Sequence, residues 1–365
     1  MRMRAAVVTE RGGPIRVEEV ELLDPGEGEV RVKIVASGVC HSCLHAADGS
    51  WTHVPLPIVL GDEGAGIVEA AGRGVRSVRE GDHVILSWSP ACGLCHYCAI
   101  GRPVLCERRA ARLGTLPDGT TRLRLRGEPL FHFGTVASHA EYTTIPESCA
   151  IPIRRDVPLE TVALIGCSVM TGVGSVLNTA RVPAGASMAV FGAGGIGLNV
   201  VQGGGLVSAH PIIAVDVLDS KLDYARRLGA THTVNGATTD PVEAIKAITG
   251  RGADFTFVAV GSARAFNQAW DALAPGGTCV LIGLPATDAT VTFTALSLQS
   301  NEKVMRGSRY GSARPREDFP RLVELYLAGR LRIDDLINRR FSLEQTDQAY
   351  RALAAGELAR GLIVN

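Results

Sequence analysis

The sequence predicts an α/β protein with two domains, one rich in β-strands and one built on a doubly wound parallel sheet. Three observations predict it. The chain has 365 residues, more than one ordinary hydrophobic core accommodates. Short alternating strands fill the first 150 residues. Beyond about residue 185, apolar strands alternate with helical stretches, as in a parallel sheet covered by helices.

The β-rich part is recognised from alternating runs at residues 30–35 and 83–86, separated by turns such as Asp24-Pro25-Gly26. The second part has four apolar strands, Ser187–Phe191, Ile212–Val215, Phe255–Val260 and Thr278–Ile282. Helical stretches such as Lys221–Leu228 and Ala263–Leu273 lie between them. The chain then closes with helical segments at Asp318–Ala328 and Asp334–Ile337 and an apolar strand at Leu362–Val364. We expect one domain at 1–168 and 310–365 and another at 169–309.

The composition argues against a nucleic-acid or membrane partner. Lys+Arg and Asp+Glu both number 37, so no net charge attracts a polyanion or an anionic lipid surface. The uncharged stretch Val182–Val215 is broken by glycines and two prolines, which favours buried α/β structure over a membrane span. The N-terminus lacks a signal-peptide core, and nine cysteines without one favour metal ligation in the cytoplasm.

Four cysteines have the spacing of a metal site. Cys92, Cys95, Cys98 and Cys106 follow the pattern C-x2-C-x2-C-x7-C, in a lobe at about 91–107. Thiolates so close in sequence can surround one tetrahedral zinc, and a closed set of four leaves no position for substrate. An iron–sulfur cluster uses similar spacing and stays an alternative. The sequence therefore predicts a structural metal site.

A glycine-rich motif predicts a dinucleotide site. Gly192-Ala193-Gly194-Gly195-Ile196-Gly197 follows a strand and opens a helix, with glycines for the turn, the pyrophosphate approach and close packing. Asp216 ends the next strand, where a carboxylate accepts ribose hydroxyls and repels a 2′-phosphate, which favours NAD over NADP. Lys221 is a second candidate for the ribose. Because Gly203-Gly204-Gly205 disfavours helix, we expect this helix to end near Gln202–Gly205.

These two motifs, together with Gly38-Val39-Cys40-His41-Ser42, resemble the zinc-dependent medium-chain alcohol dehydrogenases. The segment Phe131–Thr135 is similar to the branch of liver and formaldehyde dehydrogenases. The resemblance implies a GroES-like catalytic domain, a Rossmann NAD-binding domain, and hydride transfer between NAD and an alcohol, aldehyde or ketone. It further implies two zincs per chain and a homodimer, with a tetramer possible. We expect the region Thr278–Leu298 to supply the sheet edge for dimerisation.

The resemblance also assigns roles to individual residues. Cys40 and Cys167 become thiolate ligands of a catalytic zinc, and Ser42 takes the alcohol proton and passes it through the cofactor ribose to His45. Zinc supplies Lewis acidity while the relay carries the proton to water. The remaining cofactor contacts are His41 and Arg360 at the pyrophosphate, with Thr171. The substrate pocket is expected to contain Trp51, Trp88 and Phe133, which favour small or slender alcohols.

Two positions depart from the family pattern. The family has Gly-His-Glu-Gly at the third zinc ligand where this chain has Gly61-Asp62-Glu63-Gly64, and an Asp where it has Cys43. A metal-bound His donates its second N–H to a carboxylate, so the two changes look linked. We expect zinc on Cys40, Asp62 and Cys167, with one more negative charge and a weaker Lewis acid.

Other arrangements stay open. Cys40 and Cys43 could both bind the metal, or the site could hold none and leave a reductase without zinc. Glu63 either replaces bound water transiently or pairs with Arg360. Beyond an alcohol dehydrogenase, the chain could be a formaldehyde-type dehydrogenase acting on thiol adducts, or a non-catalytic NAD-binding protein.

Overall fold

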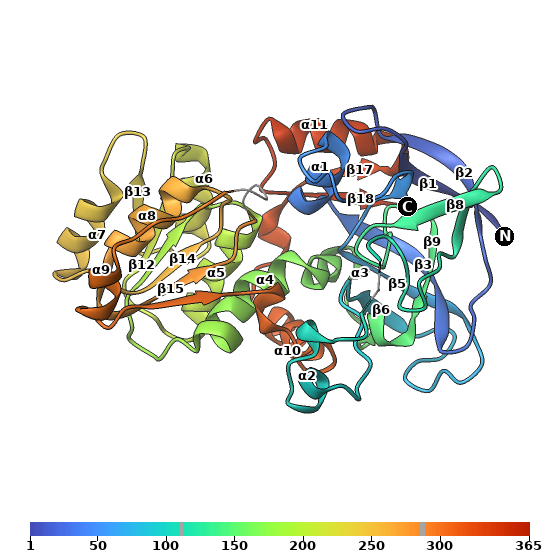
Figure 1. The fold of residues 1–365 in the computed structure, drawn as a ribbon, viewed down its shortest axis with the longest axis horizontal. Coiled ribbons are helices and arrows are strands. Elements are labelled where there is room, and N and C mark those ends of the chain that lie inside the picture. The colour runs from blue at the N-terminus through green and yellow to red at the C-terminus, as the bar shows by residue number, and fades with distance from the viewer. Residues whose placement is uncertain (110–111, 285–288) are drawn as a thin grey trace. The chain divides into compact units, whose positions relative to one another are not determined.

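The computed structural model describes residues 1–109, 112–284 and 289–365. The chain forms two compact units, and each is of mixed helix and strand, so the predicted α/β class is confirmed (Figure 1). One unit contains Met1–Cys167 and Arg314–Asn365, and the other contains Ser168–Ala313.

The first unit is built on two groups of strands. A closed barrel has the order β1 (Arg2–Val8), β2 (Arg16–Leu22), β7 (Leu123–Leu125), β8 (Glu128–His132) and β4 (Ile58–Val59). A larger sheet has the order β10 (Ala150–Pro152), β6 (His83–Leu86), β5 (Gly64–Ala71), β3 (Glu29–Gly38), β18 (Arg360–Val364) and β17 (Ile337–Ser342), and β9 (Tyr142–Pro146) also pairs with β3. Alternating buried residues in β1 and β3 explain why these segments form strands with one face on the core.

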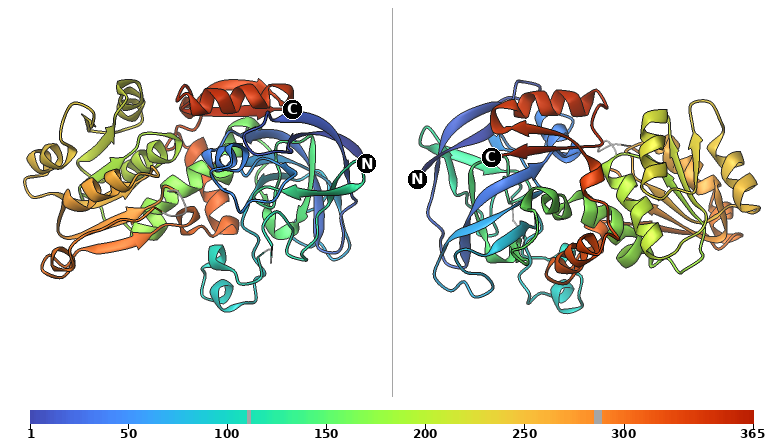
Figure 2. Two further views of the ribbon diagram at one scale, coloured as in Figure 1. Left: turned by 45° about the horizontal axis from the view of Figure 1, so that its top comes forward. Right: turned by 180° about the vertical axis from the view of Figure 1, so that it is seen from behind.

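Helices bring further residues to this unit. The helix α1 (His41–Asp48) follows β3 directly, starts after Cys40 in an extended conformation and ends at Gly49 in the left-handed region. The helix α11 (Thr346–Ala354) packs on the strands β17 and β18 (Figure 2). The unit's other helices are α2 (His96–Ala99), α3 (Leu159–Val162) and α10 (Pro315–Leu327), besides short 3-10 turns such as Asp334–Leu336.

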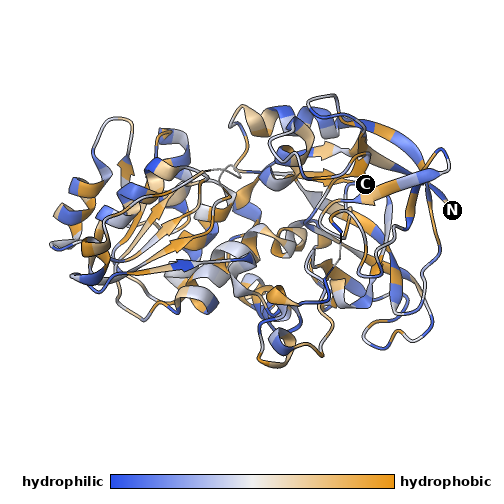
Figure 3. Ribbon diagram, in the orientation of Figure 1, coloured by the Kyte–Doolittle hydropathy of each residue, from blue (hydrophilic) through white to orange (hydrophobic). Residues whose placement is uncertain are grey.

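The second unit is a parallel sheet of six strands. Its order is β13 (His232–Asn235), β12 (Ile212–Asp216), β11 (Met188–Phe191), β14 (Ala253–Val258), β15 (Leu273–Leu281) and β16 (Val304–Gly307). The apolar central strands are the hydrophobic interior of the unit (Figure 3). The strand order reverses between β11 and β14, the point where doubly wound sheets bind ligands. The crossover helices are α5 (Gly195–Leu206), α6 (Asp219–Arg227), α7 (Pro241–Thr249), α8 (Ala263–Asp271) and α9 (Ala295–Gln299), and α4 (Ser168–Gly174) precedes the sheet.

The helix after the glycine motif ends one residue beyond the expected Gln202–Gly205. The helix α5 runs through Gly203, Gly204 and Gly205 to Leu206. A Cβ at Gly203 would lie 3.0 Å from Val176, and one at Gly204 would lie 3.0 Å from Met188. Close packing on neighbouring elements therefore offsets the poor helix propensity of glycine.

The expected sheet edge at Thr278–Leu298 is wrong for the part that forms a strand. The strand β15 is hydrogen-bonded to β14 on one side and to β16 on the other, so β16 is the edge of the sheet. Residues 285–288 of that region lie outside the described residues.

No single helix of the described ranges has the length and apolar composition needed to cross a membrane. One bent pair, Leu159–Gly166 with Ser168–Ala180, passes that test by length and composition only.

Candidate metal centres and active site

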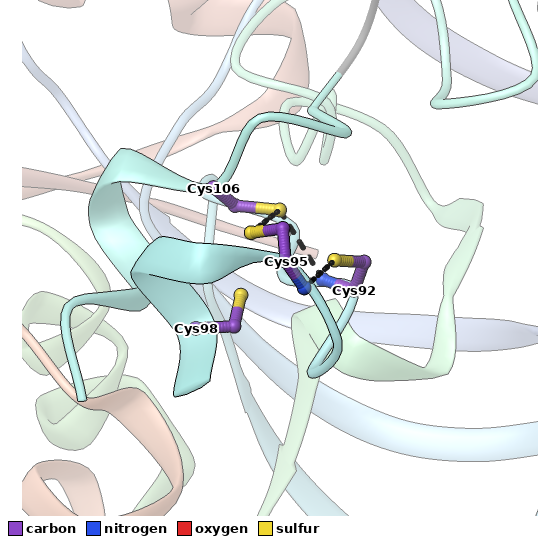
Figure 4. A group of neighbouring side chains, drawn as sticks. All are labelled: Cys92, Cys95, Cys98 and Cys106. Atoms are coloured by element: carbon purple, nitrogen blue, oxygen red, sulfur yellow. Dashed lines mark hydrogen bonds between the residues drawn. The ribbon is translucent and has the colours of Figure 1, made fainter. Parts of the chain in front are cut away.

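The four cysteines of the lobe converge on one point (Figure 4). Their sulfur atoms all lie within 4.8 Å of one another. The loop before α2 carries Cys92 and Cys95, α2 itself carries Cys98, and Cys106 follows a 3-10 turn, Pro103–Leu105. The geometry matches a closed four-thiolate site for a tetrahedral ion.

Main-chain amides of the lobe favour the thiolate form. The N–H of Cys95 donates to Cys92 Sγ at 3.3 Å, and the N–H of Cys92 donates to Cys106 Sγ at 3.3 Å. Amide hydrogen bonds from Glu107 and Cys98 lower the pKa of Cys95 to about 6. The donor set and its amides therefore fit a zinc ion without further residues.

A second group of potential ligands lies in the interior of the same unit. Cys40, Asp62 and Cys167 place one ligand atom each within 4.8 Å of one another, and all three are buried. They come from the start of α1, from the segment between β4 and β5, and from the residue before α4. Two sulfurs and a carboxylate oxygen at this spacing fit three sites of a tetrahedral zinc, leaving one position open.

The local backbone explains why Asp62 faces the cysteines. Gly61 has φ +101°, and a Cβ there would lie 2.5 Å from the backbone nitrogen of His139. The N–H of His139 donates to the carbonyl of Leu60, and the N–H of Ser138 donates to the carbonyl of Gly61. The segment 138–139 therefore clamps the chain immediately before Asp62, and only glycine fits at position 61.

The surroundings of the buried group shift the pKa values of Cys40 and Asp62 in opposite directions. The Cys167 thiol donates to the sulfur of Cys40, and with the charge of Arg360 this lowers the pKa of Cys40 to about 6. Burial raises the pKa of Asp62 well above its usual range. Metal binding to such a group releases protons, so a divalent cation suits it better than an empty, uncharged pocket.

Glu63 follows Asp62 and forms an ion pair with Arg360. Both side chains are buried, and the pair raises the pKa of Arg360. The expected pairing of Glu63 with Arg360 is therefore present, and it places a positive charge beside the thiolate of Cys40.

Cys43 is not a member of the ligand group. Its Sγ lies 3.5 Å from Asp62 Oδ1 and accepts the N–H of Gly61 at 3.3 Å. Burial raises the pKa of Cys43 well above its usual range, which favours the thiol. Cys43 thus lies beside Asp62 and outside the group of three residues that could share one metal ion.

The expected relay residues follow Cys40 on α1. Ser42 donates its N–H to the sulfur of Cys40, and His45 lies on the next turn of α1. The His45 Nδ1 is buried and has no hydrogen-bond partner among the described residues. The ring of Trp51 lies 5.4 Å from that of His45.

Apolar side chains pack around the same part of the core. Trp51 and Trp88 pack on the buried cluster that contains Phe133, Cys40 and Cys167. A Cβ at Gly134 would meet the Cβ atoms of Asp62 and Trp88, so Trp88 lies beside the carboxylate. These contacts bring the predicted substrate-pocket residues to the buried ligand group.

The dinucleotide motif lies in the second unit, at the reversal of strand order. Gly192 has φ +95°, and a Cβ at Gly197 would lie 1.8 Å from the carbonyl oxygen of Gly192, so both glycines are required there. A Cβ at Gly194 meets no atom within 4 Å among the described residues, which leaves room for a ligand. Gly195 and Ile196 form the first turn of α5.

Asp216 ends β12 next to this motif. Its carboxylate accepts the N–H of Ala193 at 2.8 Å and the N–H groups of Val217 and Leu218. Lys221 lies in the first turns of α6 and Thr171 is buried in α4, both in the second unit. His41 and Arg360 belong to the first unit, at the start of α1 and of β18. The acidic residue and the open Gly194 fit an adenosine with free ribose hydroxyls.

Three buried residues behind Asp62 had no signal in the sequence. Tyr350 on α11, His139 before β9 and Ser37 on β3 are joined by hydrogen bonds of 2.7 Å and contact Cys43 through Tyr350. None belongs to a spacing motif, and their distance in sequence from Cys40 hides the contact.

The comparisons with known proteins agree with this geometry. A family model described as "Alcohol dehydrogenase GroES-like domain" matches residues 26–155, and one described as "Zinc-binding dehydrogenase" matches residues 195–328. The alcohol dehydrogenase class-3 of Cereibacter sphaeroides is 39% identical, with 100% of both chains covered. The S-(hydroxymethyl)glutathione dehydrogenase of Komagataella pastoris is 36% identical over 100% of this chain and 97% of its own.

A solved structure gives the same result for the fold. The benzyl alcohol dehydrogenase of Acinetobacter calcoaceticus superimposes with a TM-score of 0.94 at 34% identity, covering 100% of this chain and 99% of its own. The similarity thus extends over the full length of the chain. The chain belongs to the zinc-dependent medium-chain alcohol dehydrogenase family.

Proposed function

We propose that this protein transfers hydride between NAD and an alcohol, aldehyde or ketone, with a catalytic zinc bound by Cys40, Asp62 and Cys167. One observation supports this most directly: three ligand atoms from distant parts of the sequence lie within 4.8 Å in a buried, apolar setting. A polar group of this kind has a high cost in the interior unless it binds a cation. The lobe cysteines bind the second, structural zinc.

The residues of this chain divide the work of catalysis. Zinc, when bound, supplies Lewis acidity toward the substrate oxygen. The aromatic side chains Trp51, Trp88 and Phe133 exclude water and hold the carbon skeleton. Ser42 Oγ accepts the alcohol proton, and His45, with its unpartnered Nδ1, passes it toward solvent. Arg360, which is held by its ion pair with Glu63, supports the negative charge of Cys40.

The cofactor set supports NAD over NADP. The carboxylate of Asp216 lies at the strand end where the ribose hydroxyls of the adenosine would bind, and its charge opposes a 2′-phosphate. Gly192, Gly194, Gly195, Ile196 and Gly197 provide the turn and amides for the pyrophosphate. We assign supporting contacts to Lys221, Thr171, His41 and Arg360.

Slender and aromatic alcohols are the proposed substrates. The two indoles of Trp51 and Trp88 and the ring of Phe133 belong to or pack on the apolar cluster that contains Cys40 and Cys167, and Trp88 lies beside Asp62. A solved relative that superimposes closely is a benzyl alcohol dehydrogenase. A second candidate is oxidation of a hydroxymethyl thiol adduct, which the similarity to an S-(hydroxymethyl)glutathione dehydrogenase favours.

Metal analysis with steady-state kinetics tests the proposal. We expect two zincs per chain and turnover of benzyl alcohol with NAD at a higher kcat/KM than with NADP. One zinc per chain, with reduction of carbonyls retained, would support the reductase without catalytic zinc. Faster turnover of S-(hydroxymethyl)glutathione than of any simple alcohol would favour the second candidate.

We further propose a cytoplasmic homodimer, with a tetramer as the alternative. Nine free cysteines, seven of them assigned to zinc or its neighbourhood, suit a reducing compartment. Exposed apolar side chains near the edge strand β16, Leu296 and Met305, suit a contact with a second copy. Light scattering on the zinc-loaded protein measures the assembly, and a monomer would contradict the proposal.

A further inference from the structure

The two oxygens of the Asp62 carboxylate face different partners. Oδ1 lies 3.5 Å from Cys43 Sγ, whereas Oδ2 lies 3.6 Å from Cys167 Sγ. The sulfur of Cys43 is itself held by the N–H of Gly61 at 3.3 Å. The carboxylate is thus fixed on one side by Cys43 and directed on the other toward a fellow ligand.

Behind Cys43, a chain of buried polar groups crosses the interior of the first unit. The side chain of Tyr350 is hydrogen-bonded to Cys43, and its hydroxyl lies 2.7 Å from His139 Nε2. His139 Nδ1 lies 2.7 Å from Ser37 Oγ, which contacts the main-chain carbonyl of Glu63 at 3.0 Å. None of the four side chains is more than 3% exposed.

Counting hydrogens gives the chain a direction. The S–H of Cys43 donates to Asp62 Oδ1, so the sulfur accepts the hydrogen of the Tyr350 hydroxyl. Burial lowers the pKa of His139 to about 3, so the ring is neutral, and its Nε2–H donates to the Tyr350 oxygen, whose one hydrogen goes to Cys43. His139 Nδ1 then accepts the hydrogen of the Ser37 hydroxyl, and Ser138, whose Oγ lies 2.7 Å from Ser37 Oγ, donates to the Glu63 carbonyl at 3.4 Å.

We propose that Cys43, Tyr350, His139 and Ser37 form a positioning chain that orients Asp62, so that Oδ1 receives the Cys43 S–H and Oδ2 binds the metal. This rests on the proposed function and deepens it, because it names the residues that replace the usual carboxylate partner of a histidine ligand. The chain ends at a main-chain carbonyl, which cannot pass on a proton. Its role is therefore to hold Asp62. The four members of the chain are positioning residues, and none of them is a catalytic residue.

The chain also joins distant segments of the unit. Cys43 lies on α1, Tyr350 on α11, Ser37 on β3 and His139 beside the clamp at Gly61. Leaving a buried hydrogen-bond partner unsatisfied costs more than the net gain from the bond itself. Removing one member should therefore disturb the position of Asp62 through the hydrogen bonds that remain.

Four variants in the full-length protein test the proposal. Cys43→Ala removes the donor, Cys43→Ser keeps it, and Tyr350→Phe removes the hydroxyl that holds Cys43. Tyr326→Phe is the matched control. The Tyr326 hydroxyl also donates a hydrogen bond, to Asp334 at 2.8 Å, but Tyr326 lies on α10 and is not a member of the positioning chain. Zinc retention is measured by chelator competition, with the lobe zinc as internal reference, and cobalt replaces the catalytic zinc for absorption spectra.

We expect Cys43→Ala and Tyr350→Phe to bind the catalytic zinc about 10- to 100-fold more weakly, as is typical of losses beside a metal ligand. Their cobalt spectra should shift, while Cys43→Ser and Tyr326→Phe stay near wild type. Wild-type zinc affinity and cobalt spectra in both Cys43→Ala and Tyr350→Phe would overturn the positioning chain. Equal losses in Cys43→Ser and Cys43→Ala would also overturn it, because the donor would then be irrelevant.

Two measurements distinguish failure of the positioning chain from failure of the proposed function. A wild-type protein with only the lobe zinc would defeat the proposed function itself, whereas two zincs with insensitive variants would defeat the positioning chain alone. If Tyr350→Phe fails to fold, as judged by loss of NAD binding, the Cys43→Ser and Cys43→Ala pair decides the question.

Discussion

The four-cysteine lobe and the group of Cys40, Asp62 and Cys167 both bring cysteine side chains together, yet they are assembled in opposite ways. The lobe takes its ligands from residues 92–106 and supports them with its own amides, in a partly exposed loop. The buried group takes its ligands from three separate segments and is surrounded by side chains from β3, α1 and α11. Local spacing builds the first site, and the tertiary fold builds the second.

The largest expected difference is between two cysteine variants. Cys98→Ala should lose the lobe zinc, leave the lobe open to trypsin at Arg102 and retain the other metal, because four thiolates organise that loop. Cys167→Ala should keep the lobe intact but lower kcat/KM about 10³-fold or more, since Lewis acidity is worth several kcal/mol. Zinc content, limited proteolysis and kinetics check both. Proteolysis of the lobe in Cys167→Ala would erase the distinction between the sites.

The rate of metal loss offers a second contrast. With three protein ligands and an open position, the buried group should release zinc to a chelator about tenfold faster than the closed lobe. Release of the first equivalent, followed with a colorimetric chelator, should therefore parallel loss of activity. Full activity after one equivalent has left would show that the lobe exchanges first.

Changing Asp62 to histidine should sharpen the contrast in charge. Asp62→His removes one negative charge from the ligand set, so the pH profile for alcohol oxidation should move about one unit toward acid. Adding Cys43→Asp supplies an acceptor for the second imidazole N–H, and the double variant should retain zinc better than Asp62→His alone. Profiles that superimpose on wild type would contradict the role of Asp62 as a ligand.

The smallest expected effect is the loss of folding stability in acid that two buried histidines cause. Burial lowers the pKa of His132 and of His139 to about 3, below the value of about 6.5 for an unfolded histidine. Unfolding therefore takes up protons below pH 6.5, so this stability is complete above that pH and is lost as the pH falls toward 3. The loss is up to about 1.4 kcal/mol per pH unit for each histidine.

Substitution separates the two histidines. His132→Gln and His139→Gln should each reduce the pH dependence of urea unfolding between about pH 6.5 and pH 5 by a similar amount. Only His139→Gln should weaken the catalytic zinc, because only His139 contacts Tyr350. Equal zinc affinity in both variants would argue against a link between His139 and the buried group.

The comparison also shows what the sequence could predict. Periodicity located four of the six strands of the second unit to within a few residues and missed β13 and β16, and the strand His83–Leu86 is confirmed with its predicted bounds. Cysteine spacing predicted the lobe group because all four ligands lie in one loop. Glycine propensity predicted the end of α5 to within one residue, but the contacts of Gly203 and Gly204 with Val176 and Met188 are tertiary and could not be predicted. The buried chain through Tyr350 and His139 was missed for the same reason, because its members are far apart in sequence.

The clamp at Gly61 has an evolutionary consequence. A metal ligand can be exchanged when a partner changes with it, and Asp62 with Cys43 offers such a compensated pair beside a zinc. Gly61 has no comparable freedom, since any side chain would collide with the backbone of residues 138–139. Family members of this kind should therefore vary at the position of Asp62, the proposed metal ligand, more readily than at the position of Gly61. Variation at the neighbouring glycine would demand a rebuilt loop.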